Sequence, residues 1–200
     1  MRSTLLALLC AAGAVYADNP EVGGGSLYYP VKVGARRVSQ VRAGDRTIEI
    51  VETVTQVEMK EGKHLVTVEA VHHTEQDRTT TDVYEVSDRG LSRVSGRQKE
   101  GEPLLLLKVG AKEGESWTAD QAGPGGAVGK ATYTMGKVEG VKVPAGTFKA
   151  RRVDAEIKFG TRTTKLSYWF AAGVGSVKFE AGSGGVTTQT TVLKSFTPEK

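Results

Sequence analysis

Three histidines, His64, His72 and His73, are the side chains best suited to metal binding or acid–base chemistry. All three fall in one predicted strand, where alternate side chains face opposite sides of the sheet. His64 and His72 therefore share one face, and His73 points to the other. At the rise of a strand, His64 and His72 lie about 26 Å apart, which is too far to share one ion. We therefore expect exposed or edge histidines and no metal site.

Two serines stand in glycine-rich surroundings, Ser176 after Gly175 and Ser183 after Gly182. Neither is part of the Gly-x-Ser-x-Gly elbow that exposes a nucleophile between a strand and a helix. The stretch 123–129 contains several glycines but lacks the Gly-Lys-Ser/Thr ending of a phosphate-binding loop. We interpret 123–129 as a connecting loop and 182–185 as a hairpin tip.

Close pairs of carboxylates, such as Glu49 with Glu52 and Glu113 with Glu115, are expected by chance in a chain with 25% charged residues. We interpret them as solvated surface positions. The sequence therefore predicts a protein that is not an enzyme, with no catalytic residue, no bound metal and no cofactor.

The aromatic residues Tyr168, Trp169 and Phe170 are consecutive, so Tyr168 and Phe170 face one side of a strand and Trp169 the other. Two interpretations remain open. The side chains of Tyr168 and Phe170 fill a core while Trp169 packs under a loop or at an edge, or one side lines an apolar pocket. In the second case the candidate ligand-binding residues are Tyr133, Phe159, Tyr168 and Phe170, with Met135 and Phe179 as further wall residues.

The elements that would position these side chains are strands. Val153, Ala155, Ile157 and Phe159 alternate with charged residues, which indicates a strand with one solvated face over 152–159. The link 160–162 suits a hairpin to the next aromatic strand. In 46–60 the apolar phase changes between Val54 and Val57, which predicts a bulge. Further strands are expected at 63–74, 79–87, 131–139, 175–181 and 186–196, and the short apolar run 104–107 fits either a helix or a strand.

The composition agrees with this pattern, because the chain has 25 glycines, which favour turns, and many Val and Thr residues, which favour strands. We predict an all-β, mainly antiparallel fold, as a curved sheet, an open half-barrel or a β-sandwich-like domain. The runs 31–36 and 107–112 resemble each other. They indicate two similar halves of one sheet or, as we favour, two unrelated turns of one type.

The N-terminus has the pattern of a secretory signal peptide, with Arg2, an apolar run from Leu5 to Ala12, and a cleavage site after Ala17. The run is too short to span a bilayer. The only cysteine, Cys10, lies inside this run and follows Leu9, which is unlike a lipidated cysteine. We expect a signal peptide at 1–17, a flexible leader at 18–26, and a single antiparallel β domain at 27–200 without disulfides, exported to the periplasm or the extracellular space.

Four different sequence motifs follow one another along the chain. They are Tyr29-Pro30-Val31-Lys32-Val33-Gly34, the run from Leu107-Lys108-Val109-Gly110 to Trp117, Val143-Pro144-Ala145-Gly146-Thr147-Phe148-Lys149-Ala150, and Tyr168-Trp169-Phe170-Ala171-Ala172-Gly173-Val174-Gly175-Ser176-Val177-Lys178.

From Tyr28 to the C-terminus this order resembles an uncharacterised group of exported bacterial β proteins, the domain of unknown function 3108-like group. The chain departs from the group after Gly34, where Arg36-Arg37-Val38 stands in place of an aromatic residue. The resemblance implies a curved antiparallel sheet, loosely like the periplasmic lipoprotein carriers in which a sheet wraps an apolar cavity.

Two functions follow as hypotheses. The first is a binding module whose curved sheet holds an apolar or lipid-like small molecule. The second is a structural or protein-interaction module whose partner is a protein of the cell envelope. The net charge of +4 comes from interspersed charges without a basic block, so nucleic acid is not an expected partner. No second apolar stretch is long enough for an integral membrane span.

Overall fold

The computed structural model describes residues 27–94, 103–122 and 128–199. The expected signal peptide, the leader and most of the loop 123–129 lie outside these residues. The described part contains strands and no helix, and so no helix that could cross a membrane. The strands are β1 (Arg36–Ala43), β2 (Arg46–Lys60), β3 (Lys63–His73), β4 (Arg78–Ser87), β5 (Gly90–Arg93), β6 (Leu104–Lys108), β7 (Ser116–Ala122), β8 (Val128–Val143), β9 (Gly146–Phe159), β10 (Arg162–Ala171), β11 (Gly175–Ser183) and β12 (Val186–Thr197).

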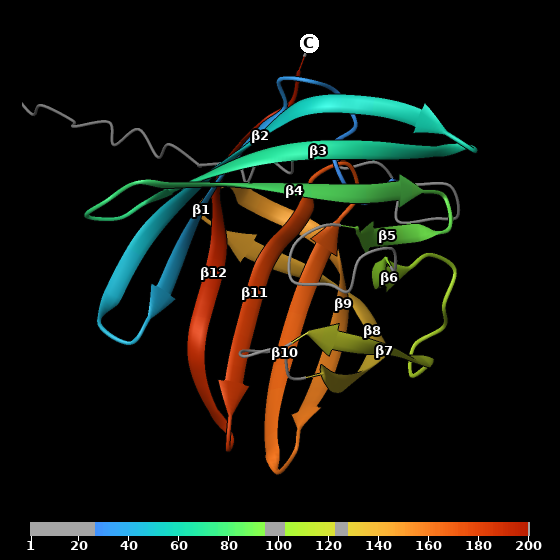
Figure 1. The fold of residues 1–200 in the computed structure, drawn as a ribbon, viewed down its shortest axis with the longest axis vertical. Helices are drawn as coiled ribbons and strands as arrows, with labels where there is room; N and C mark the ends of the chain where they lie inside the picture. Colours follow the sequence, from blue (N-terminus) through green and yellow to red (C-terminus); the bar gives the residue numbers. More distant parts are fainter. Residues whose placement is uncertain (1–26, 95–102, 123–127, 200) are drawn as a thin grey trace, which may run out of the picture.

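All twelve strands form one antiparallel sheet in the order β6-β5-β4-β3-β2-β1-β12-β11-β10-β9-β8-β7. Strands that follow each other in sequence also lie side by side, apart from β6 and β7, and the pairing of β1 with β12 joins the first strand to the last. The sheet therefore curves into a nearly closed, barrel-like shape, with β6 and β7 as its two edges (Figure 1). The predicted all-β, antiparallel fold is confirmed.

The inner face of this sheet carries the main hydrophobic core. Alternate residues point inward, as in β9, where Val153, Ala155 and Ile157 are buried in one cluster. In β2 the register with β3 shifts between Val54 and Gln56, and both Val54 and Val57 pack into that same cluster. The predicted bulge is thus confirmed, because the extra residue returns the apolar phase to the inner face. The run 104–107, which periodicity left open, is the strand β6.

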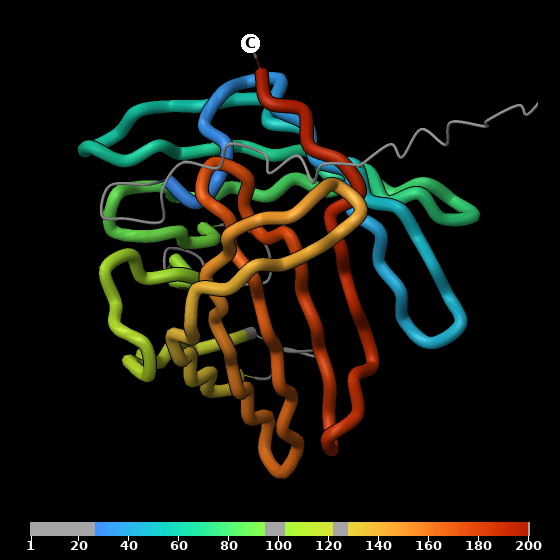
Figure 2. The backbone as a smooth tube through the Cα atoms, turned by 180° about the vertical axis from the view of Figure 1, so that it is seen from behind, coloured from blue at the N-terminus to red at the C-terminus, as the bar shows by residue number. Residues whose placement is uncertain are grey.

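A second, smaller core lies on the outer face. The hairpin of β8 and β9 extends beyond the sheet edge and folds across the outside of β10, β11 and β12 (Figure 2). Under it, Trp169 is buried with Val141, Phe148 and Leu193. The indole Nε1 of Trp169 donates a hydrogen bond of 2.6 Å to Glu139. Trp169 therefore packs under another segment, as one of the two interpretations expected.

Glycines in the left-handed region form the turns that the motifs predicted. Gly34 and Gly110 have φ angles of +89° and +82°. In each turn the next alanine donates its N–H to the carbonyl two residues before the glycine, Ala35 to Lys32 and Ala111 to Lys108. The similar runs 31–36 and 107–112 are therefore turns of one type. The tip 182–185 is also a hairpin, in which Gly184 and Gly185 take φ angles of +61° and +83°.

Trp117 connects the two edge strands at the open side of the sheet. The Nε1 of Trp117 on β7 donates a 3.0 Å hydrogen bond to the carbonyl of Leu105 on β6. The Trp117 ring also stacks on Tyr133, with 5.6 Å between the ring centroids. In the described part of the chain this hydrogen bond links the two edge strands without a β-ladder between them.

We expect Trp117→Phe to loosen this edge. The phenyl ring keeps most of the stacking and loses the hydrogen bond, so the free energy of unfolding should fall by about 1 kcal/mol. Hydrogen exchange should become faster at the amides of β6 and stay unchanged at the β1–β12 junction. Equal acceleration at both places would show that the bond does not act at the open side.

Candidate functional site

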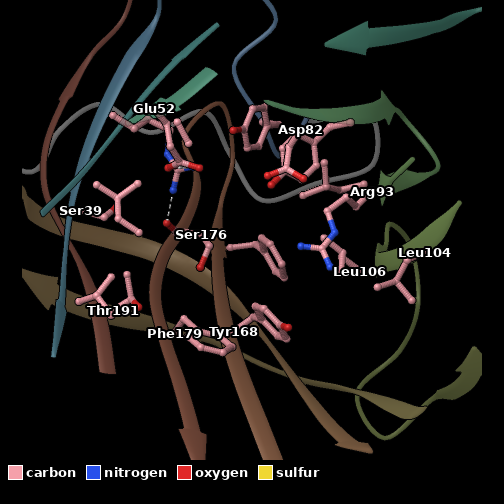
Figure 3. A pocket seen from close by; sticks show the side chains of 18 of the residues that line it. Ser39, Glu52, Asp82, Arg93, Leu104, Leu106, Tyr168, Ser176, Phe179 and Thr191 are labelled. Atoms are coloured by element: carbon pink, nitrogen blue, oxygen red, sulfur yellow. Dashed lines mark hydrogen bonds and ion pairs between the residues drawn. The ribbon is translucent and has the colours of Figure 1, made fainter. Parts of the chain in front are cut away.

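A cavity of about 340 Å³ lies inside the barrel-like sheet. Its wall combines apolar and aromatic side chains with a small number of charged groups, and several of them are drawn in Figure 3. The lining residues come from the segment before β1 and from ten strands: Tyr29, Arg37, Ser39, Val41, Ile50, Glu52, Ala70, His72, Asp82, Tyr84, Leu91, Arg93, Leu104, Leu106, Gln121, Tyr168, Phe170, Ser176, Phe179, Gln189 and Thr191.

The cavity exists because small side chains face inward on one side of the sheet. Ser39 on β1, Ala70 on β3 and Thr191 on β12 all line it. Elsewhere on the inner face, Tyr133 and Met135 are almost completely buried and fill the interior. The interior is therefore a packed core in one part and a hollow in another, which combines the two interpretations that the sequence left open.

Of the four predicted ligand-binding residues, two line the cavity. Tyr168 and Phe170 stack with 5.6 Å between their ring centroids, and Phe179 lies 4.9 Å from Tyr168. Tyr133 is stacked on Trp117 in the packed core, and Phe159 packs against the same core cluster. Neither belongs to the cavity wall, because β8 and the end of β9 lie over the filled part of the interior. A role of any of the four in binding stays a prediction.

Arg37 is the most buried charge in the site. Its Nη1 is 2.9 Å from Oε2 of Glu52, and its Nη2 donates to the carbonyl of Ser176 at 2.5 Å. Its guanidinium carbon also lies 5.4 Å from the ring centroid of Tyr29. Burial acts to lower the pKa of Arg37, but the negative charge of Glu52 and the contact with Tyr29 outweigh it and raise that pKa. The ion pair therefore keeps this arginine charged inside the sheet.

Tyr29 closes one end of the interior. It precedes β1, is 3% exposed, and stacks on Tyr84 with 4.7 Å between the centroids. Gly175 permits this packing, because a Cβ there would lie 3.1 Å from the Tyr29 ring and 3.3 Å from the Arg37 guanidinium. The Gly-Val-Gly motif of residues 173–175 thus makes the tight reversal and the close approach together.

The tyrosines around the cavity are held in the neutral form. Burial raises the pKa of Tyr29, Tyr84 and Tyr133 above the ordinary value of 10.0, and it raises the pKa of Tyr168 to about 12. The positive charge of Arg93 opposes this rise at Tyr84, Tyr133 and Tyr168. At neutral pH these phenols are therefore hydrogen-bond donors as well as apolar surface.

Several polar side chains lie in a different environment from the one that the sequence predicted. Glu52 was expected at a solvated surface, but it faces inward and pairs with Arg37. His72 was expected to be exposed or at an edge, yet it lines the cavity and lies 3.2 Å from Oγ1 of Thr80. The tertiary fold explains both, because inward positions of β2 and β3 face a hollow that tolerates polar groups. His73 is exposed and pairs with Asp77.

Sequence reasoning missed Arg37, Glu52 and Arg93 as site residues. A signal was present, because Glu52 is in phase with Ile50 and Val54, and Arg93 is in phase with Leu91. A charge at an apolar phase of a strand indicates an inward polar group. The described residues contain no group of three or more His, Cys, Asp or Glu side chains that could hold a metal ion.

Comparison with known proteins shows similarity at the level of the fold. No protein-family model matches the chain, and no curated protein matches it. A crystal structure from Bacteroides fragilis, described as an exported protein with a YmcC-like fold, is similar with a TM-score of 0.62 at 15% identity, over 86% of this chain and 99% of that one. A structure from Parabacteroides distasonis, described as a lipoprotein, is similar with a TM-score of 0.55 at 12% identity, with the same two coverages.

We expect Glu52→Gln to destabilise the protein, because it leaves the buried Arg37 charge without its carboxylate. The free energy of unfolding should fall by about 3 kcal/mol, measured by urea denaturation. Glu49→Gln is the matched control on the same strand, since Glu49 pairs with Lys194 at the surface and should matter little. Equal losses in the two variants would contradict the buried ion pair.

We also expect stability to fall in alkali. The pKa of each buried tyrosine is higher in the folded than in the unfolded chain, so the unfolded chain loses its phenolic protons first as the pH rises. This contribution is complete below pH 10 and is lost as the pH rises toward about 12. Urea midpoints measured from pH 8 to 12 should decline more gently in Tyr168→Phe than in the wild type. Parallel declines would show that Tyr168 is not protected from ionisation.

Proposed function

We propose that the chain is an exported, non-catalytic module that holds an apolar or lipid-like ligand in the cavity inside its sheet. The observation that carries the proposal is the cavity of about 340 Å³, which lies within the size range of small-molecule sites. Its wall of Tyr168, Phe170, Phe179 and leucines, with a few convergent polar groups, is the usual composition of such sites.

Support for export comes from the signal-peptide pattern at 1–17 and from the two similar structures, described as an exported protein and a lipoprotein. Membership of the domain of unknown function 3108-like group is part of the same proposal and rests on the four motifs. Support for binding rather than catalysis comes from Ser176, one of the two serines among the residues that line the cavity. Its hydroxyl donates to the carbonyl of Lys178 instead of to a histidine.

The first experiment is native mass spectrometry of the protein purified from its own compartment, combined with organic extraction. A stoichiometric apolar molecule supports the binding module. A protein that is consistently free of ligand, and that also fails to bind a neutral apolar dye, contradicts it. That outcome would favour the alternative, an interaction module of the cell envelope.

A matched pair of variants locates the binding. Thr191 lines the cavity and Thr190 is its neighbour on the opposite face of β12, so both can be changed to phenylalanine. We expect Thr191→Phe to reduce binding of the neutral dye N-phenylnaphthylamine by about tenfold, because the new ring occupies the hollow. Thr190→Phe should bind the dye as the wild type does. Equal effects of the two changes would place the dye outside the cavity.

A further inference from the structure

Arg93 brings a second positive charge into the cavity. It is the last residue of β5 and lines the hollow beside Leu104 and Leu106. Figure 3 shows its guanidinium turned into the cavity, on the side that faces Tyr168. The guanidinium is therefore directed into the interior instead of toward bulk water.

The two inward arginines differ in their partners. Arg37 has a carboxylate and a backbone carbonyl within hydrogen-bonding distance. Arg93 forms no ion pair with any residue that the structure describes. The Nε atoms of both arginines are buried without a hydrogen-bond partner, so the two side chains differ in the carboxylate and the carbonyl that Arg37 contacts. Arg93 is partly buried, and a partly buried guanidinium without an anion costs free energy. Arg93 is thus the group in the wall that gains most from an anionic ligand.

The carboxylates that line the cavity do not form an ion pair with Arg93. Glu52 is engaged with Arg37. Asp82, on the neighbouring strand β4, also lines the cavity, but no ion pair of 4.0 Å or less joins it to Arg93. His72, the remaining titratable group besides the tyrosines, lies by Thr80. Asp82 therefore moderates the positive potential without satisfying the hydrogen bonds of the guanidinium.

We propose that the ligand is an amphiphile with an anionic head group, of the long-chain carboxylate class, whose head pairs with Arg93 while its chain lies against Tyr168, Phe170 and Phe179. A planar guanidinium binds a carboxylate through two parallel hydrogen bonds. The hydroxyls of Tyr84 and Tyr168 stand in the same wall as further donors. This inference rests on the proposed function and adds the chemical class of the ligand to it.

The test compares probes that share a chain and differ in their head groups. Dodecanoate, dodecanol and dodecyltrimethylammonium are each added below their critical micelle concentrations, and the displacement of N-phenylnaphthylamine is measured at neutral pH. The wild type should bind dodecanoate about tenfold more tightly than dodecanol, because a charge-assisted pair forms with a partly buried cation that lacks an anion. The ammonium probe should bind most weakly.

Variants at the head-group position decide the assignment. Arg93→Gln should abolish the preference for dodecanoate and keep the affinity for dodecanol, whereas Arg93→Lys should keep most of the preference. Asp82→Asn should tighten dodecanoate by a few-fold, because it removes a nearby negative charge. Arg42→Gln on the exposed face of β1 is the control and should behave as the wild type. Dodecanol binding also shows that each variant retains a folded cavity.

The outcomes separate the two proposals. If dodecanol and dodecanoate bind equally to the wild type, or if Arg93→Gln keeps the preference, the anionic head group is wrong and the apolar cavity stands. If no probe displaces the dye and no ligand is found, the binding function itself fails. A loss of the preference in both Arg93→Gln and Arg42→Gln would mean that general surface charge, and not the cavity, attracts the anion.

Discussion

The buried guanidinium of Arg37 depends on partners from separate parts of the chain. Glu52 comes from β2 and the carbonyl of Ser176 from β11. The Tyr29 ring comes from the segment before β1. These groups meet only when β1 pairs with both β2 and β12, and this pairing is what bends a meander of twelve strands into a nearly closed sheet. The ion pair of Arg37 and the closure of the sheet therefore stabilise each other. The sheet remains open between its edge strands β6 and β7.

The interior inside that closure is divided by side-chain size. Large residues such as Tyr133 and Met135 fill one part to high packing density. Small residues on β1, β3 and β12 leave the other part hollow, where arginines and tyrosines take the place of a continuous apolar filling. A hollow with buried charge contributes less to stability than a packed core does. The filled part and the closed sheet support it.

The outer face needs its own explanation, because most of it is solvated. The extended hairpin of β8 and β9 covers β10, β11 and β12 and buries Trp169. Lys178 and Arg152 lie over the Trp169 ring, with their charged atoms 4.5 Å and 5.1 Å from its centroid. The sheet is thus packed on both sides along these strands. That double packing holds in place the strands that present Tyr168 and Phe170 to the cavity.

The sequence alone determined the local features of this protein. Alternation placed Val153, Ala155 and Ile157 on one face, the phase change before Val57 located a bulge, and the glycine motifs located turns, because each depends on neighbouring residues only. Tertiary structure decided the rest. The pairing of β1 with β12 joins residues that are distant in sequence, so no local pattern shows that Arg37 meets Ser176 or that Tyr133 packs in the filled core while Tyr168 faces the hollow. Whether an inward side chain meets another side chain or empty space depends on the strand across the interior, and only the closed sheet brings that strand into place.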